Sequence, residues 1–331
     1  MVELLSPVGD FECLKAAVQN GADTVYFGAS SFSARAFASN FNDDDLKKAI
    51  TYAKIRGIKT NLTLNTLLKD NEFNDAIKLA EKAYIYGIDA IIVQDLGFAK
   101  YLIENFPGLA VHASTQLSVH NLEGVLKLQE LGFSRVVLSR ELSLPEIEHI
   151  CKNSNVEIEV FVHGALCISY SGQCLFSSMV GGRSGNRGKC AQPCRLPYEL
   201  TNQSEVFDKG YLLSPRDLCG LEYLPQLVKA GVSCLKIEGR MKTPEYVATV
   251  TRIYRKYLDL AKSTESNKLY KIDVQDKQDL LQVFNRGGFS DGHLSGFPNK
   301  NLVYSEKSNN MGVFLGNISK FNNNKGHIGY E

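Results

Sequence analysis

A short run of β-branched and aromatic residues, followed by a segment with helical periodicity, recurs along this chain. The eight runs lie at residues 2–5, 24–27, 59–64, 90–93, 110–114, 135–138, 157–162 and 233–237. This alternation is typical of parallel βα units, because parallel strands need a long crossover that a helix usually supplies. Several helical segments end at glycine, including Gly21 and Gly57, where a left-handed residue commonly closes a helix.

Eight βα units fit either a (β/α)8 barrel or an open doubly wound sheet. After the first strand the chain reads Ser6-Pro7-Val8-Gly9-Asp10, which lacks the glycine-rich phosphate loop of nucleotide-binding open sheets. Polar residues follow one strand after another, among them Asn61, Asn65, Gln94, Gln116, Arg140, His163, Glu238 and Arg240. Taken singly these are ordinary turn residues, but together they indicate the catalytic rim of a barrel. We therefore predict an α/β fold of the (β/α)8 TIM type.

Two regions depart from the repeat. Residues 164–213 separate the seventh strand from its helix and hold four of the eight cysteines. After the last helix, residues 266–331 contain Gly- and Asn-rich turns with strand-like runs at 302–305 and 312–315. We predict a barrel over residues 1–265 that includes the Cys-rich insertion, and a small C-terminal β-rich segment that we expect to be truncated.

Charge and hydropathy indicate the compartment. Lys and Arg number 37 and Asp and Glu 36, so the net charge of +1 does not suggest a nucleic-acid coat protein. We recognise no secretory signal at the start of the chain, and no run approaches the roughly 18 apolar residues of a membrane helix. We expect a cytoplasmic protein that does not enter a membrane, whose thiols stay reduced rather than forming a disulfide framework.

Four cysteines cluster in the insertion. Cys167, Cys174, Cys190 and Cys194 follow the spacing C-x6-C-x15-C-x3-C. So many thiols in a reducing compartment point to a soft metal, either structural zinc or an iron–sulfur cluster. The paired CxxC knuckles of zinc sites are missing, which favours the cluster. The alternative is unrelated buried thiols.

The insertion is also basic. Residues 160–198 contain no Asp or Glu, whereas Arg183, Arg187, Lys189 and Arg195 are cationic. Such a segment suits a cluster site, a small anion or RNA phosphate. A merely solvated basic loop is the alternative.

The eighth strand ends in a charged run, Lys236-Ile-Glu238-Gly-Arg240. Lys236 and Glu238 alternate with apolar residues, so both side chains should point into the barrel, where an ionic pair is costly unless it serves a site. Arg240 could clamp a carboxylate or a phosphate. His112 and His163 are as readily satisfied core histidines as proton carriers.

Several segments together resemble peptidase family U32, the collagenase-like family. They are residues 5–9, 20–28, 112–116, 163–195, 214–219 and 236–246. The family is named for a reported peptidase activity. It also includes factors for oxygen-independent hydroxylation of a tRNA uridine, of a 23S rRNA cytidine and in ubiquinone synthesis.

The resemblance implies a 4Fe–4S cluster on Cys167, Cys174 and Cys190, with Cys194 as fourth ligand and Cys219 or Cys234 as substitutes. The run Cys190-Ala-Gln-Pro-Cys194-Arg resembles the RNA-modifying branch, which is associated with prephenate as hydroxyl donor. The implied activity is hydroxylation of a wobble uridine at C5. The implied partners are tRNA, or alternatively rRNA, and a small anionic donor, with room for a protein partner.

This hypothesis assigns roles to the predicted site residues. Lys236, Glu238 and His163 would be catalytic, the last two handling protons. The substrate or donor contacts would come from Arg240, Arg183, Arg187, Arg195, Gln116, Asn65 and Arg140. One alternative is a collagenase-like peptidase with a Cys167–His163 dyad, although HExxH and GxSxG motifs are absent. Another is a non-enzymatic scaffold that binds RNA or a partner through the basic loop.

Overall fold

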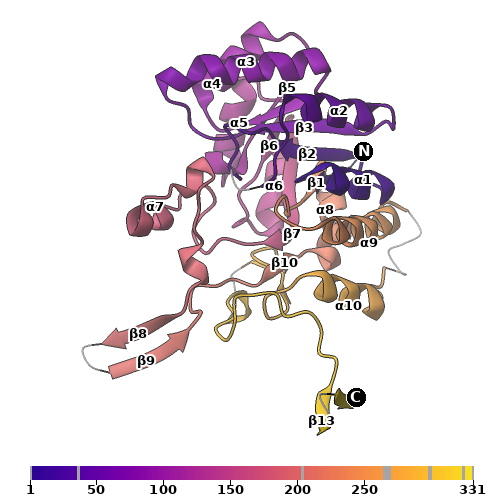
Figure 1. The fold of residues 1–331 in the computed structure, drawn as a ribbon. Coiled ribbons are helices and arrows are strands. Elements are labelled where there is room, and N and C mark those ends of the chain that lie inside the picture. The colour runs from indigo at the N-terminus through magenta and orange to yellow at the C-terminus, as the bar shows by residue number, and fades with distance from the viewer. Residues whose placement is uncertain are drawn as a thin grey trace.

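The computed structural model describes residues 2–35, 38–202, 205–263, 270–296, 300–322 and 325–329. Within these residues, eight parallel strands close into a barrel with helices on the outside (Figure 1). They are β1 (Glu3–Pro7), β2 (Thr24–Gly28), β3 (Lys59–Leu64), β4 (Ala90–Val93), β5 (Ala110–Ala113), β6 (Arg135–Val137), β7 (Glu157–Ala165) and β11 (Cys234–Ile237). Strands pair in chain order up to β7, and β11 lies between β7 and β1. The predicted (β/α)8 barrel is confirmed.

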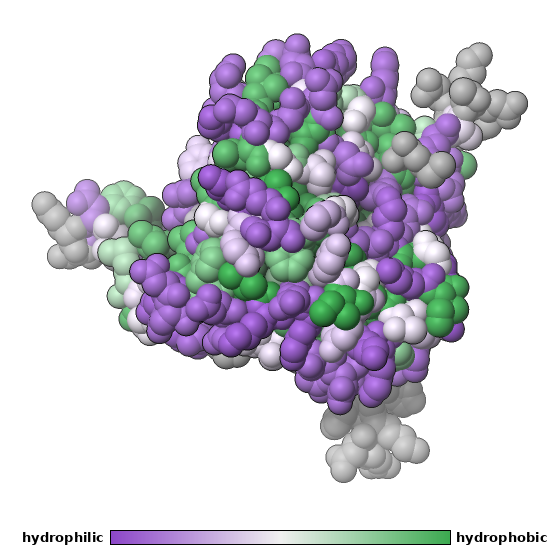
Figure 2. Space-filling view, turned by 90° about the horizontal axis from the view of Figure 1, so that it is seen from above, coloured by the Kyte–Doolittle hydropathy of each residue, from purple (hydrophilic) through white to green (hydrophobic). Residues whose placement is uncertain are grey.

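The barrel helices turn their apolar sides to the strands. They are α1 (Phe11–Gln19), α2 (Asp43–Lys54), α3 (Asp70–Tyr86), α4 (Leu96–Asn105), α5 (Leu122–Glu130), α6 (Leu144–Asn153), α8 (Leu224–Ala230) and α9 (Pro244–Lys262). Their starts follow local chemistry: Asp10 and Asn42, for example, accept from backbone N–H groups in the first turns of α1 and α2. Seen from above, the face nearest α2–α4 is mostly hydrophilic (Figure 2). No helix in the described ranges is both long and apolar enough to cross a membrane.

Outward and inward strand residues form different cores. Outward residues such as Leu235 and Ile237 of β11 join the large apolar layer beneath the helices. A small apolar cluster contains Leu5, Tyr26, Ile92 and Cys234, and buried charged side chains lie beside it. The interior of the barrel is therefore partly polar, which is unusual unless those groups are paired.

The Cys-rich insertion folds against the end of β7. It contains α7 (Phe176–Gly181), the 3-10 helices η2 (Gly185–Arg187) and η3 (Pro193–Arg195), and the strands β8 (Tyr198–Asn202) and β9 (Glu205–Gly210), and the strand β10 (Asp217–Cys219) follows it directly. The β8–β9 hairpin projects away from the barrel (Figure 1). β10 pairs antiparallel with the last residues of β7, Asp217 lying opposite Ala165. The insertion is thus fastened to the barrel wall.

The C-terminal segment packs on the barrel as well. Helix α10 (Val274–Val283) contacts α9, and β12 (Phe289–Ser290) pairs with β10. The strand-like runs predicted at 302–305 and 312–315 are not strands: the first follows the 3-10 helix η6 (Lys300–Leu302) and makes one isolated bridge from Val303. Its backbone bonds to the insertion instead, since Tyr304 N donates to Ser214 O. A separate hairpin, β13 (Asn317–Asn322) and β14 (Lys325–Gly329), follows.

Candidate functional site

A cavity of about 400 Å³ opens where the carboxyl ends of the strands meet the insertion. Its charged lining residues are Arg35, Arg140, Arg195, Lys236, Glu238, Arg240, Lys242 and Arg286. Of these described side chains only Glu238 is acidic, so the cavity favours an anionic ligand. The same cavity is lined by the four cysteines of the insertion.

Glu238 lies among three guanidinium groups. Arg35 Nη2 donates to Glu238 Oε1 at 3.1 Å. Burial would raise the pKa of this carboxyl, but Arg35, Arg240 and Arg140 lower it to about 2. Glu238 is therefore a fixed anion near neutral pH. This weighs against the prediction that it handles protons, because a carboxylate so strongly stabilised is a weak base.

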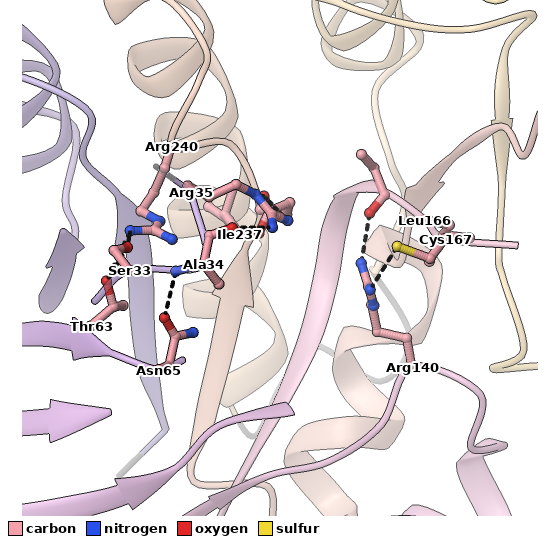
Figure 3. Close-up of polar contacts among 12 residues, drawn as sticks. Ser33, Ala34, Arg35, Thr63, Asn65, Arg140, Leu166, Cys167, Ile237 and Arg240 are labelled. Atoms are coloured by element: carbon pink, nitrogen blue, oxygen red, sulfur yellow. Dashed lines mark hydrogen bonds and ion pairs between the residues drawn. The ribbon is translucent and has the colours of Figure 1, made fainter. Parts of the chain in front are cut away.

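Arg240 fastens the loop between β2 and α2 to the barrel. Its Nη1 donates to Ser33 Oγ at 2.7 Å and to Thr63 Oγ1 at 2.9 Å (Figure 3). A Cβ atom on Gly28 would lie 2.7 Å from this nitrogen, so the close approach requires glycine. Arg240 lines the cavity as predicted, but Nη1 is already used within the protein.

Lys236 pairs with a residue other than the one expected. Its Nζ lies 2.8 Å from Glu159 Oε1 on β7, and both side chains are buried. Glu159 Oε2 also contacts Arg135, which reaches Glu3 at 2.7 Å. The sequence placed Lys236 and Glu238 on one inward face and suggested an ionic pair between them. In the structure Lys236 joins this interior network, whereas Glu238 pairs with Arg35.

The four predicted metal ligands lie around one space. Cys167, Cys174, Cys190 and Cys194 all line the cavity and all are free thiols. Arg140 Nη2 donates to Cys167 Sγ at 3.4 Å (Figure 3). The pKa of Cys194 is raised by burial; Arg195 lowers it, and the other three cysteines raise it again. The sulfurs are thus close enough for their charges to interact.

Four thiols are the donor set that a 4Fe–4S cluster takes. Among the described residues, no three His, Cys, Asp or Glu side chains converge as ligands for one metal ion. A 4Fe–4S cluster takes four thiolates spread over its irons, and this cavity offers four with cationic neighbours. The possible substitutes Cys219 and Cys234 do not line it. Cys219 lies 3.8 Å from Tyr254 Oη, and Cys234 is in the small interior cluster.

His163 lies outside the cavity. The pairing of β7 with β11 shifts register between Lys236 and Ile237, so that Ile237 pairs with His163. This irregularity turns His163 outward, where its Nδ1 lies 3.2 Å from Tyr254 Oη in α9. Burial, with a smaller effect of Lys242, lowers its pKa to about 3. His163 is therefore a neutral core histidine, which contradicts its predicted proton role.

The predicted Cys167–His163 dyad is not formed in the described structure. The hydrogen-bond partner of the Cys167 thiol is Arg140, and that of the His163 ring is Tyr254. Nucleophile and base must lie within hydrogen-bond reach for thiol–imidazole catalysis. The described structure therefore does not support this dyad as the site of the peptidase alternative.

The basic residues of the insertion hold the insertion itself. Arg187 contacts Glu72 Oε1 in α3 at 2.5 Å and Leu67 O at 2.7 Å. Arg183 Nε donates to Lys189 O, and neither arginine lines the cavity. Their predicted contact with substrate in this cavity is not seen. Arg195 does line it, while also donating to Leu166 O at 2.9 Å.

The remaining rim residues reach the cavity. Asn65 Oδ1 accepts from Ala34 N at 3.0 Å, which supports the loop that carries Arg35. Gln116 Oε1 and Arg140 Nε are buried and have no hydrogen-bond partner among the described residues. Such orphaned groups are costly unless a ligand or water satisfies them. An acceptor and a donor are thus available to a bound molecule.

Three cavity residues escaped the sequence analysis. Arg35 lies in a loop without a recognisable motif, and Arg286 lies beyond α10, far from the other site residues in sequence. Lys242 belongs to the run that follows β11 and could have been found by its nearness to Arg240. Arg286 had no local signal, because only the packing of the C-terminal segment brings it to the barrel mouth.

Comparison with known proteins shows that residues 9–303 match the model of peptidase family U32. An uncharacterized protease of Methanocaldococcus jannaschii is 41% identical over 297 residues, covering 86% of this chain and 71% of that protein. A 23S rRNA 5-hydroxycytidine synthase of Escherichia coli is 43% identical over 260 residues, covering 78% of this chain and 39% of that protein. The tRNA hydroxylation protein P1 of Bacillus subtilis is 38% identical over 268 residues, covering 78% and 63%. The chain thus spans less than two thirds of the length of two of these relatives.

Proposed function

The chain belongs to peptidase family U32, and we propose that it is an RNA-modifying enzyme that hydroxylates a tRNA uridine at C5 of the wobble position without molecular oxygen. Relatives named for hydroxylation of tRNA and of 23S rRNA support RNA as the substrate class. The observation that carries the proposal is that four cysteines and seven cationic side chains line one cavity.

Cys167, Cys174, Cys190 and Cys194 would hold a 4Fe–4S cluster. When bound, the cluster supplies one-electron redox chemistry to the cavity. Arg140 Nη2 and Gln192 N donate to the sulfurs of Cys167 and Cys190 at 3.4 and 3.3 Å. Donors to sulfur stabilise thiolate charge and adjust the potential of such a site.

The cationic lining would bind the anionic partners. We propose prephenate as the hydroxyl donor, because a dicarboxylate matches a cavity with one acidic and seven cationic side chains. Arg140 Nε, which is buried and unpaired in the described structure, offers a donor. Gln116 Oε1 offers an acceptor, which suits the N3–H group of a uracil ring.

Metal content and RNA modification measured together test this function. The chain and four single variants, each with one lining cysteine changed to Ala, are purified anaerobically and assayed for iron and sulfide. Each is also expressed in a host without its own tRNA hydroxylation, and 5-hydroxyuridine is measured by mass spectrometry. Cys151→Ala is the matched control, because Cys151 lies in α6 away from the cavity.

We expect about four irons per chain, lost together with 5-hydroxyuridine in each lining-cysteine variant and retained in Cys151→Ala. Unmodified RNA from a host whose chain carries the full iron content would overturn the proposed activity. Hydrolysis of a collagen peptide by iron-free protein, abolished by alkylation of Cys167, would replace it with the peptidase.

A further inference from the structure

Lys242 lies in the cavity, and its amino group is not bonded to any carboxylate of the described residues. It follows β11 closely, lines the cavity and is partly buried. Its Nζ lies over the rings of Phe284 and, at 5.7 Å from the centroid, Tyr246. In the described part of the chain, Nζ has no hydrogen bond or ion pair with a carboxylate. The other lining lysine, Lys236, is by contrast bonded to Glu159.

Charged groups from three other elements, and Glu238 from its own segment, face Lys242. Arg286, beyond α10, and Arg195, in η3, disfavour its protonated form, whereas Asp217 in β10 and Glu238 after β11 favour it. Both acids are already paired, Asp217 with Arg286 at 2.8 Å and Glu238 with Arg35. Burial, followed by Arg286, therefore lowers the pKa of Lys242 to about 7.

Most other charged groups in the cavity cannot exchange a proton near neutral pH. Five are guanidinium groups, which stay protonated in proteins. Glu238 stays ionised, and burial raises the pKa of Tyr26 so that it stays a phenol. The thiols are assigned to the cluster. His163, the sequence-based candidate, faces α9 instead.

We propose that Lys242 is the acid–base group of this cavity, taking a proton from a bound ligand as a neutral amine and returning it to water as an ammonium. In this transfer an N–H bond forms at Nζ, the hydrogen leaves the ligand atom, and the electron pair of the broken bond stays on the ligand. The inference rests on the proposed function, because a ring carbon that becomes hydroxylated must lose its hydrogen. A lysine desolvated beside other cations is suited to this role.

Competitive labelling of the holoenzyme tests the titration directly. The anaerobic protein is treated with trace acetic anhydride across pH 5 to 11, with Nα-acetyl-lysine as internal standard, and the labelled peptides are quantified by mass spectrometry. We expect labelling of Lys242 to reach half its plateau near pH 7, about three pH units below the standard. A midpoint for Lys242 within one unit of the standard would overturn the proposal, whatever the activity of the protein.

Two variants separate proton transfer from charge. Lys242→Arg keeps the positive charge but cannot release a proton, and Lys242→Met removes both. We expect each to lower 5-hydroxyuridine at least 100-fold at wild-type iron content, whereas Lys229→Met, on the exposed side of α8, leaves it unchanged. Wild-type hydroxylation by Lys242→Arg would overturn the proposal. If the wild-type chain hydroxylates no RNA, the proposed function fails, and the labelling midpoint still decides whether Lys242 titrates as proposed.

Discussion

Arg35 Nη2 lies 3.1 Å from Glu238 Oε1, and this ion pair joins the loop after β2 to the end of β11. The two residues are more than two hundred positions apart in sequence. The bond closes one side of the cavity, and the carboxylate balances three cationic neighbours: Arg35, Arg240 and Arg140. The geometry of the barrel mouth therefore depends on a single negative charge.

Replacing this charge should destabilise the protein. Glu238→Gln leaves guanidinium groups without a counter-charge, and we expect a loss of about 3 kcal/mol in unfolding free energy, measured by urea denaturation at pH 7. Because folding lowers the pKa of Glu238 from 4.5 to about 2, the stabilisation is present above pH 4.5 and is lost as pH falls toward 2. Glu81→Gln, on the exposed side of α3, is the control. Equal losses in the two variants would contradict the role of Glu238.

His163 should matter for stability rather than for catalysis. His163→Phe keeps the ring packing against Tyr254 and Phe289 and loses one hydrogen bond, so we expect about 1 kcal/mol of destabilisation at pH 7 with iron and 5-hydroxyuridine retained. Folding lowers the pKa of His163 from 6.5 to about 3, so its neutral burial costs stability as pH falls from 6.5 toward 3. The unfolding free energy of the variant should therefore fall less steeply than that of the wild type as the pH is lowered from 6.5 toward 3. A 100-fold loss of hydroxylation at full iron content would restore a catalytic role.

The interior network distinguishes two glutamates that contact the same arginine. Glu159→Gln leaves Lys236 and Arg135 buried without their shared carboxylate, for which we expect a loss of about 3–5 kcal/mol. Glu157→Gln is the matched control, because Glu157 also contacts Arg135 but is 53% exposed, and its loss should be about 1 kcal/mol or less. Urea denaturation measures both. A similar cost for the two variants would show that burial of Glu159 does not strengthen its pairing.

Two arginines of the insertion should behave differently. Arg187→Ala removes a partly exposed contact with Glu72, so we expect a cost of about 1 kcal/mol or less and unchanged iron content. Arg195→Ala removes hydrogen bonds to Leu166 O, Ser214 Oγ and Pro215 O, which hold η3 against the residues that follow β7 and precede β10. We expect faster proteolysis of the insertion and loss of iron in this variant alone. Retention of iron by Arg195→Ala would count against that holding role.

The sequence predicted the regular part of the molecule well because its signal is local. The runs 59–64 and 90–93 coincide with β3 and β4, because parallel strands that are buried on both faces form short runs that can be recognised in the residues themselves. The four cysteines were found for a similar reason, as their clustering is visible in the chain. That the four cysteines line one cavity could be seen only in the folded structure.

Sequence-based prediction failed for residues whose orientation or partner is set by contacts between distant parts of the chain. His163 stands two residues after Phe161, which lines the cavity, and regular alternation would face both inward. The register shift opposite Lys236 and Ile237 turns the His163 side chain to the outside of the barrel. No local sequence pattern predicts this shift. The partner of Lys236 is likewise set by the neighbouring strand β7. Arg286 enters the site only because α10 and the segment after it pack against α9 and β10.

Closure of the barrel has a consequence for folding during synthesis. Leu4 of β1 pairs with Leu235 of β11. The first strand therefore lacks one of its two neighbours until nearly the whole barrel has been synthesised. Until β11 inserts, β1 and β7 each present an unpaired edge, and contacts so distant in sequence form slowly. Open edges pair readily with other chains. A nascent or broken chain that ends before Cys234 is therefore prone to aggregation, and insertion of β11 is the step that protects the barrel from it.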